Sequence, residues 1–298
     1  MIDHALGNLR RGRLRHQLDA IVAATGKRLD FDLDATTFDP SVVLAQVAAP
    51  MQVDSVELRR LVAAFHRSGS VNGVIEGLGA PTVERRIRSC TALGALRLED
   101  AVPWVAPLLR AKNPKVSASA ARALGRIGGV RSADALIAAI QHKGPRRTFI
   151  GALARAAPDL FLETALQSRL RRGTLAAVAI AAGLRRRHTA IGPLTSLLGT
   201  GTHRQRVICC RVLGWCRSRS AIAPVMLALF DRDWRVRMAA IKALTLLERA
   251  SPADQLEIFL QVERLLQDPD MRIRSAARRT VRRLSDVLLK RGTPWPWR

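Results

Sequence analysis

The chain alternates short apolar segments with longer amphipathic segments, in which apolar residues return every three or four positions. That period is typical of one face of an α-helix. The pattern predicts amphipathic helices at 83–96, 115–127, 146–156, 171–183, 203–214, 234–247 and 271–284. Most of them follow a shorter, often proline-containing apolar segment. The chain is therefore predicted to be a series of helix pairs.

The second helices of these pairs share a phrase that ends in Leu-Gly. The glycines of this phrase at Gly94, Gly125 and Gly214 are 31 and 89 residues apart, and the larger spacing is close to three periods of 30. Self-similarity at such a period is the signature of a solenoid. The predicted fold is an all-α, right-handed α-solenoid of about six to seven helix pairs.

The predicted domains are 1–75, 76–284 and 285–298. The first does not match the repeat and is expected to form an atypical helical N-terminal cap, because terminal repeats must present a polar outer face. Its helices are predicted near 10–24, 41–49 and 54–67. The second domain is the repeat solenoid, and the third is a tail rich in Trp, Pro and Arg.

The repeated phrase resembles the HEAT-like repeats of the bacterial phycobilisome-lyase type, whose second helix reads Val-Arg-x-x-Ala-Ala-x-Ala-Leu-Gly. The resemblance covers about residues 82–284. That family includes scaffolds, a few enzymes and bilin lyases. A divergent helical N-terminus followed by repeats is also similar to bacterial HEAT proteins that partner membrane glycosyltransferases. The resemblance implies a surface that binds a partner.

The net charge of +25 is concentrated in the middle of the chain. Residues 101–230 contain 21 Lys or Arg and only three acids, whereas residues 1–100 contain 13 Lys or Arg and 12 acids. A block of this kind attracts polyanions or acidic surfaces.

Basic residues gather where the predicted second helices begin. The first of these helices has Arg85, Arg86 and Arg88 near its start. The candidate anion- or partner-binding residues of the later helices are Lys115, Arg146, Arg147, Arg171, Arg172, Arg204, Arg206, Arg235 and Arg237. Second helices line the concave face of a HEAT stack, so a ladder of cations is expected there. Cations beside free backbone N–H groups favour anion binding.

The alternative role for these arginines is structural, with each side chain bonded to a turn aspartate of a neighbouring repeat. This role suits Arg235 and Arg237, because aspartates at 231, 233, 268 and 270 are near in sequence. It is less expected for the helices that begin near 115, 146, 171 and 203, whose own turns contain no acid. For those helices we expect external anion binding.

Two enzymatic branches of the HEAT fold can be compared with the chain. The di-iron hydroxylases use repeated His-Glu pairs as metal ligands. In this chain no histidine is followed by Glu: the residues after His4, His16, His66, His142, His188 and His203 are Ala, Gln, Arg, Lys, Thr and Arg. The alkylpurine DNA glycosylases place an aspartate and tryptophans in a basic groove. No acid lies one helical turn after Trp104, Trp215 or Trp234. The chain is predicted to be non-enzymatic, with a DNA glycosylase or a bilin lyase as alternatives.

No catalytic residue, metal or cofactor is predicted. The Asp30-x-Asp32-x-Asp34 segment has Ala35 where a calcium loop needs glycine. Cys209 and Cys210 are adjacent on a helix and point about 100° apart, so one zinc ion cannot easily bind both. These cysteines are expected to pack in the core.

The tail supplies a candidate anchor in Trp295, Trp297 and Arg298, residue types that favour a membrane interface or a partner's groove. Its alternative role is to cap the last repeat.

No signal peptide is evident, and the longest apolar stretches are about half the roughly 20 residues that span a bilayer. The predicted location is cytoplasmic, with peripheral attachment at the inner membrane face as a variant.

The predicted function is a scaffold or adaptor whose basic concave face binds an acidic protein or an anionic membrane-associated partner. The alternative is a nucleic-acid-binding protein that contacts the phosphate backbone, which needs only cations. Aromatic residues make up only 4% of the chain. Their scarcity argues against binding of single strands, which uses base stacking.

Overall fold

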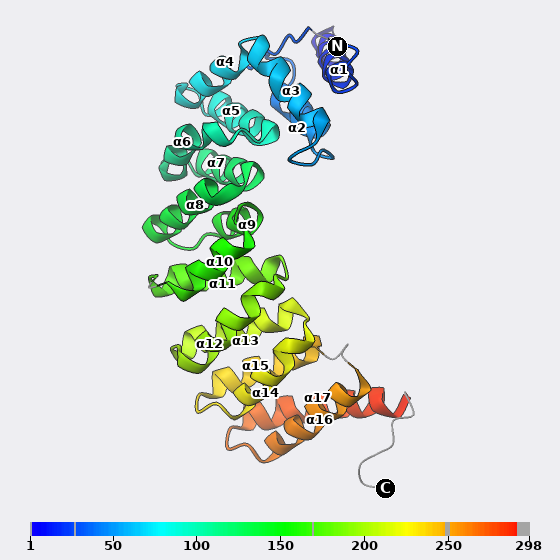
Figure 1. The fold of residues 1–298 in the computed structure, drawn as a ribbon, viewed down its shortest axis with the longest axis vertical. Coiled ribbons are helices and arrows are strands. Elements are labelled where there is room, and N and C mark those ends of the chain that lie inside the picture. The colour runs from blue at the N-terminus through cyan, green and yellow to red at the C-terminus, as the bar shows by residue number, and fades with distance from the viewer. Residues whose placement is uncertain (1, 27, 169, 248–250, 291–298) are drawn as a thin grey trace. The chain divides into compact units, whose positions relative to one another are not determined.

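A computed structural model describes residues 2–26, 28–168, 170–247 and 251–290. Every regular element in these residues is helical, which confirms the all-α fold (Figure 1). The chain divides into two compact units, Met1–Pro158 and Asp159–Arg298. We call them unit 1 and unit 2 and describe each by itself.

Unit 1 begins with three helices that do not belong to the repeat and continues with three helix pairs, α4/α5, α6/α7 and α8/α9. Its helices are α1 (Ile2–Val22), α2 (Pro40–Ala48), α3 (Val56–Arg67), α4 (Ser70–Glu76), α5 (Val83–Leu96), α6 (Val102–Val105), α7 (Pro114–Ile127), α8 (Gly129–Lys143) and α9 (Arg147–Ala156). The second helices α5, α7 and α9 contact one another in order. The predicted segment 1–75 thus supplies α1–α3 and most of α4.

Unit 2 contains four helix pairs, α10/α11, α12/α13, α14/α15 and α16/α17, in its described residues. Their bounds are α10 (Asp159–Gln167), α11 (Arg172–Leu184), α12 (Ile191–Thr200), α13 (His203–Cys216), α14 (Ile222–Leu227), α15 (Trp234–Leu247), α16 (Pro252–Glu263) and α17 (Met271–Lys290). The second helices α11, α13, α15 and α17 again contact one another in order. All seven predicted second helices are present, and the last one is longer than predicted.

Short 3₁₀ helices extend or introduce many of the first helices. They are η1 (Gly77–Gly79), η2 (Glu99–Ala101), η3 (Ala106–Arg110), η4 (His188–Ala190), η5 (Arg219–Ala221), η6 (Ala228–Phe230) and η7 (Arg264–Gln267). Proline explains part of this irregularity. Pro103 lies in the first turn of α6 and Pro107 in that of η3, positions that tolerate the missing N–H.

The Leu-Gly pairs of the repeated phrase set how closely the second helices approach. A Cβ atom on Gly94 would lie 2.8 Å from the Cα of Ala123, and one on Gly214 would lie 2.9 Å from the Cα of Ala243. Gly125 stands in the same relation to Ala152, at 3.0 Å. Small residues on both sides therefore allow backbone-to-backbone packing.

Arg88 ties the N-terminal helices to the first repeat. Its Nη1 donates hydrogen bonds of 2.8 Å to the carbonyl oxygens of Leu33 and Ala35. Leu33 is buried, and the ring of Phe31 meets that of Phe65 edge-on, with centroids 4.8 Å apart. Phe31 and Leu33 thus belong to a partly buried segment between α1 and α2.

Candidate anion-binding surface

The predicted cations of unit 1 have exposed side chains at the starts of α7 and α9. Lys115 follows Asn113, whose side chain caps α7 by accepting a hydrogen bond of 2.9 Å from the Lys115 N–H. Arg146 and Arg147 are also exposed, and the guanidinium of Arg146 lies 5.8 Å from the centroid of the Phe149 ring.

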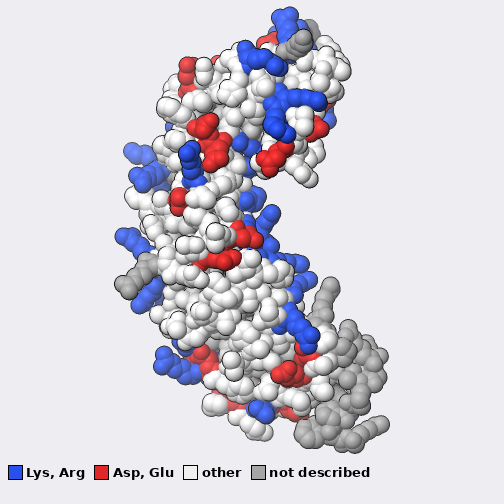
Figure 2. Space-filling model, in the orientation of Figure 1, with Lys and Arg blue, Asp and Glu red and all other residues white. Residues whose placement is uncertain are grey.

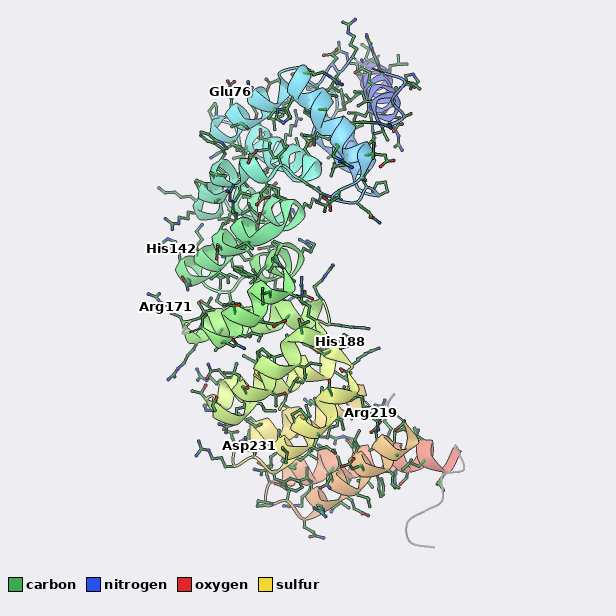
Figure 3. All side chains as sticks on the ribbon, viewed as in Figure 1. Glu76, His142, Arg171, His188, Arg219 and Asp231 are labelled. Carbon is green, nitrogen blue, oxygen red and sulfur yellow. The ribbon has the colours of Figure 1, made fainter. Side chains whose placement is uncertain are left out.

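In unit 2, Arg171, Arg172, Arg204 and Arg235 are exposed at the starts of α11, α13 and α15. Arg171 and Asp231 lie at one edge of unit 2, in the turns that connect a first helix to the second helix of its pair. His188 and Arg219 lie at the opposite edge (Figure 3). The helix starts therefore follow one edge of the second-helix layer.

Arg206 and Arg237 have inward-facing side chains. Arg206 is only 7% exposed, and its Nε and Nη2 donate hydrogen bonds of 2.7 and 2.8 Å to the two carboxylate oxygens of Asp231. Arg237 holds Asp268 in the same way, with both bonds at 2.8 Å. The structural role weighed for Arg237 is confirmed. The expectation that Arg206 lacks an acidic partner is wrong, because the acid comes from the turn of the next repeat.

Each of these aspartates also organises its own turn. Asp231 accepts a hydrogen bond of 2.8 Å from the N–H of Asp233, and Asp268 accepts one of 2.9 Å from the N–H of Asp270. Asp233 and Asp270 in turn accept bonds from the N–H groups of Arg235 and Arg272, at 2.8 and 2.7 Å. The two Asp-x-Asp turns thus join neighbouring repeats and cap the following helix.

The pKa of Asp231 reflects this pairing. Burial alone would raise it, but the hydrogen bonds from Arg206 and from the Asp233 N–H outweigh burial and lower the pKa below its ordinary value. The hydrogen bond to Asp231 likewise raises the pKa of Arg206. Both groups therefore stay charged, and the Arg206 guanidinium is not available to a partner.

A second row of cations accompanies the helix starts and was not predicted. Seven residues after Lys115, Arg204, Arg235 and Arg272 come Arg122, Arg211, Lys242 and Arg279, and all eight side chains are exposed. Seven residues fall about 20° short of two helical turns, so each pair shares one face of its helix. The 7-residue spacing in the sequence could have revealed this row.

We call the six cations of unit 2 in these two rows the second-helix array. Its members are Arg204, Arg211, Arg235, Lys242, Arg272 and Arg279, on the successively contacting helices α13, α15 and α17. The two cations of one helix are about 10 Å apart along its axis, and neighbouring helix axes are about 8–10 Å apart. In Figure 2, Lys and Arg side chains are visible on the surface of each unit.

Trp234 connects two members of the array. The guanidinium carbons of Arg235 and Arg272 lie 4.9 and 4.8 Å from the centroid of its ring, a cation–π distance. Arg235 also lies 3.9 Å from an Asp233 carboxylate oxygen. The guanidinium groups of Arg235 and Arg272 thus both lie against one indole ring and repel each other. An anion bound between them would reduce this repulsion.

Comparison with known families identifies the repeat. The sequence model of HEAT repeats matches residues 71–156 and 194–282, more than half of the chain. The chain belongs to the HEAT-repeat family. A search of curated protein sequences finds no significant match.

Three solved structures illustrate how the HEAT chain compares with known folds. An archaeal HEAT-like repeats protein from Thermococcus onnurineus NA1 is 15% identical over 83% of this chain and 98% of its own, with a TM-score of 0.31. Human deoxyhypusine hydroxylase in complex with glycerol is 16% identical over 96% of this chain and 99% of its own, with a TM-score of 0.36. An engineered protein is 16% identical over 92% of this chain and 79% of its own, with a TM-score of 0.37. At these TM-scores the similarities do not bear on function.

The cysteines of the HEAT repeats lie in the core. Burial raises the pKa of Cys90, Cys209 and Cys210 to about 12 and that of Cys216 to about 11. These thiols are free and buried, which confirms the predicted core packing of Cys209 and Cys210. The described part of the chain holds no group of His, Cys, Asp or Glu suited to a metal ion.

The candidate tail anchor, Trp295, Trp297 and Arg298, lies outside the described residues. Among the helices that the structure describes, none has an apolar stretch long enough to cross a membrane.

Proposed function

We propose that this HEAT protein is a non-enzymatic scaffold that binds an acidic protein segment through the second-helix array. The observation that carries the proposal is the set of six exposed cations on three successive helices. Neither α13 nor α15 contains an Asp or Glu. Arg235 has Asp233 nearby, and the side chains of the other five members form no ion pair with a carboxylate among the described residues.

The spacing of the array suits a partner that carries several negative charges. Cations about 10 Å apart in two directions can pair with carboxylates on a helix or an extended segment, and the summed field speeds association. Arg206 and Arg237 add nothing to this field, because Asp231 and Asp268 neutralise them. The exposed members differ from them in having their charge directed to solvent.

A nucleic acid is the second candidate partner, because phosphate-backbone binding needs only cations. The array contains little surface for base stacking, since Trp234 is half-buried and already contacts two guanidinium groups. This favours an acidic protein over a single strand. An anionic membrane-associated partner, such as a membrane glycosyltransferase, would also present negative charges to the array. Such a partner would suit a cytoplasmic protein with repeats of the phycobilisome-lyase-like type.

A charge-reversal experiment tests the array. The variant Arg204→Glu, Arg211→Glu, Lys242→Glu should bind a labelled polyglutamate peptide at least about tenfold more weakly than the unmodified protein. The matched control reverses Arg185, Arg186 and Arg217, three exposed residues in the loops after second helices. It has the same net charge and should lose much less affinity. Circular dichroism should show both variants folded.

Three results would count against the proposal. Equal losses in the two variants would mean that diffuse charge is responsible. Affinity independent of salt would exclude an electrostatic site. Duplex DNA bound with a steep salt dependence, in the absence of peptide binding, would favour the nucleic-acid alternative.

A further inference from the structure

The turn between η6 and α15 shows what an aspartate at this point of a repeat does. The Asp231 carboxylate accepts hydrogen bonds from the Arg206 guanidinium and from the Asp233 N–H, at 2.7 to 2.8 Å. The turn before α17 repeats the arrangement with Asp268. One carboxylate therefore accepts hydrogen bonds from the guanidinium of the preceding repeat and from the backbone N–H two residues later.

The same place in unit 1 can be located from the glycine contacts. Arg206 lies eight residues before Gly214, and Asp231 lies 12 residues before Ala243, on which Gly214 packs. In unit 1, Arg86 lies eight residues before Gly94, and Ala111 lies 12 residues before Ala123, on which Gly94 packs. The two glycine contacts differ by only 0.1 Å.

Ala111 therefore places a methyl group where Asp231 and Asp268 place a carboxylate. The donors that such a carboxylate would satisfy are present. Arg86 has a buried Nε without a hydrogen-bond partner. Within the described residues the backbone N–H of Asn113, the counterpart of the Asp233 N–H, has no partner either.

A third donor reaches the same turn from the following repeat. The Lys143 ammonium donates a hydrogen bond of 2.8 Å to the carbonyl oxygen of Ala111 and is half-buried. Lys112 and Lys115 are exposed on either side of Asn113, and residues 101–133 contain no Asp or Glu. The turn thus concentrates positive charge that the protein itself does not neutralise nearby in sequence.

We propose that Arg86, the Asn113 N–H and Lys143 form a binding site for a carboxylate from another molecule. The ligand class is the carboxylate of an Asp or Glu side chain in an acidic peptide. It would occupy the position that Asp231 and Asp268 fill in unit 2. Arg86, Ala111, Asn113 and Lys143 are all half-buried, whereas Arg206 is buried, so part of each of these four residues is accessible to a ligand, although the Arg86 Nε itself is buried. The site is separate from the second-helix array and does not rest on it.

Replacement of Ala111 tests the site, with sodium acetate as the probe and sodium chloride at equal ionic strength as the reference. Acetate should raise the Tm of the unmodified protein by about 1–2 °C near saturation. Ala111→Asp should raise the Tm in chloride and remove the acetate effect, because it supplies the carboxylate internally. Ala111→Asn, of the same size but uncharged, should keep much of the acetate effect.

Two further measurements keep the test decisive if a variant folds poorly. Acetate should shift the ¹⁵N–¹H signals of the Asn113 amide and the Arg86 Nε of the unmodified protein, and Arg86→Gln should remove the Tm increment. An equal acetate effect in the unmodified protein and Ala111→Asp would overturn the proposal. A response to phosphate without one to acetate would overturn the carboxylate assignment.

Discussion

The turn before α15 in unit 2 and the turn before α7 in unit 1 precede second helices that pack in the same way, yet they treat an arginine of the preceding repeat differently. In unit 2, Asp231 pairs with Arg206, and the charges cancel inside the stack. In unit 1, Ala111 leaves Arg86 without a carboxylate partner among the described residues. The Ser117 Oγ and the Lys143 ammonium each donate a hydrogen bond of 2.8 Å to a backbone carbonyl there, of Leu109 and Ala111 respectively. The helix stack therefore does not require the ion pair. Where the ion pair forms, as at Arg206, the arginine contributes to stability. Where it is absent, as at Arg86, we infer that the arginine remains available to a ligand.

Removing one side of the unit 2 pair should have the largest effect on this comparison. Asp231→Ala leaves the Arg206 guanidinium, whose side chain is 8% exposed, without its bidentate partner. We expect the free energy of unfolding to fall by about 3 kcal/mol, measured by urea denaturation. Ala111→Ser, a change at the equivalent position of unit 1, is the matched control and should change it by well under 1 kcal/mol. Equal losses would show that the two turns do not differ in the way described.

Core truncation should affect the two units alike. Leu124 and Leu213 each precede a repeat glycine and have 0% exposure. Leu124→Ala and Leu213→Ala should each cost about 2–5 kcal/mol, from lost transfer free energy and from the cavity. Urea unfolding followed by circular dichroism can measure both. A large loss in one unit alone would mean that the glycine-centred packing differs between them.

Acid should weaken unit 2 through its aspartates. The pKa of Asp231 is lowered in the folded protein, and so is that of Asp254, chiefly by hydrogen bonds with Ser251 and then by Arg219. A carboxyl with a depressed pKa stabilises the fold above its unfolded value, about 3.9, and this contribution is lost as pH falls through the folded value. Asp231→Asn should therefore reduce the dependence of urea stability on pH below about pH 4. An unchanged dependence would contradict the assignment.

The fold was largely predictable because its information is local and repeated. Small residues at helical spacing and Leu-Gly pairs predict the second helices, and α5, α7 and α15 occur within a residue of their expected bounds. The first helices were harder to place, since their prolines break them into short α-helical and 3₁₀ pieces.

The candidate site was predictable only in part. The exposed cations at helix starts follow from the sequence, and so would Arg122, Arg211 and Lys242 if the 7-residue spacing were applied. The partner of Arg206 does not follow from its own turn, because Asp231 lies 25 residues later, in the turn of the next repeat. Assigning that pair requires knowing which repeats stack and in which register.

The contact between each repeat glycine and the alanine of the next helix has a consequence for how this surface can evolve. Gly94, Gly125 and Gly214 fix the distance between successive second helices from within the core. Side chains at the solvent face can then change sign or size without altering that distance. The core packing therefore keeps the spacing between surface positions constant. A lineage could change its ligand by substituting the solvent-facing residues of the second helices while that spacing stays the same.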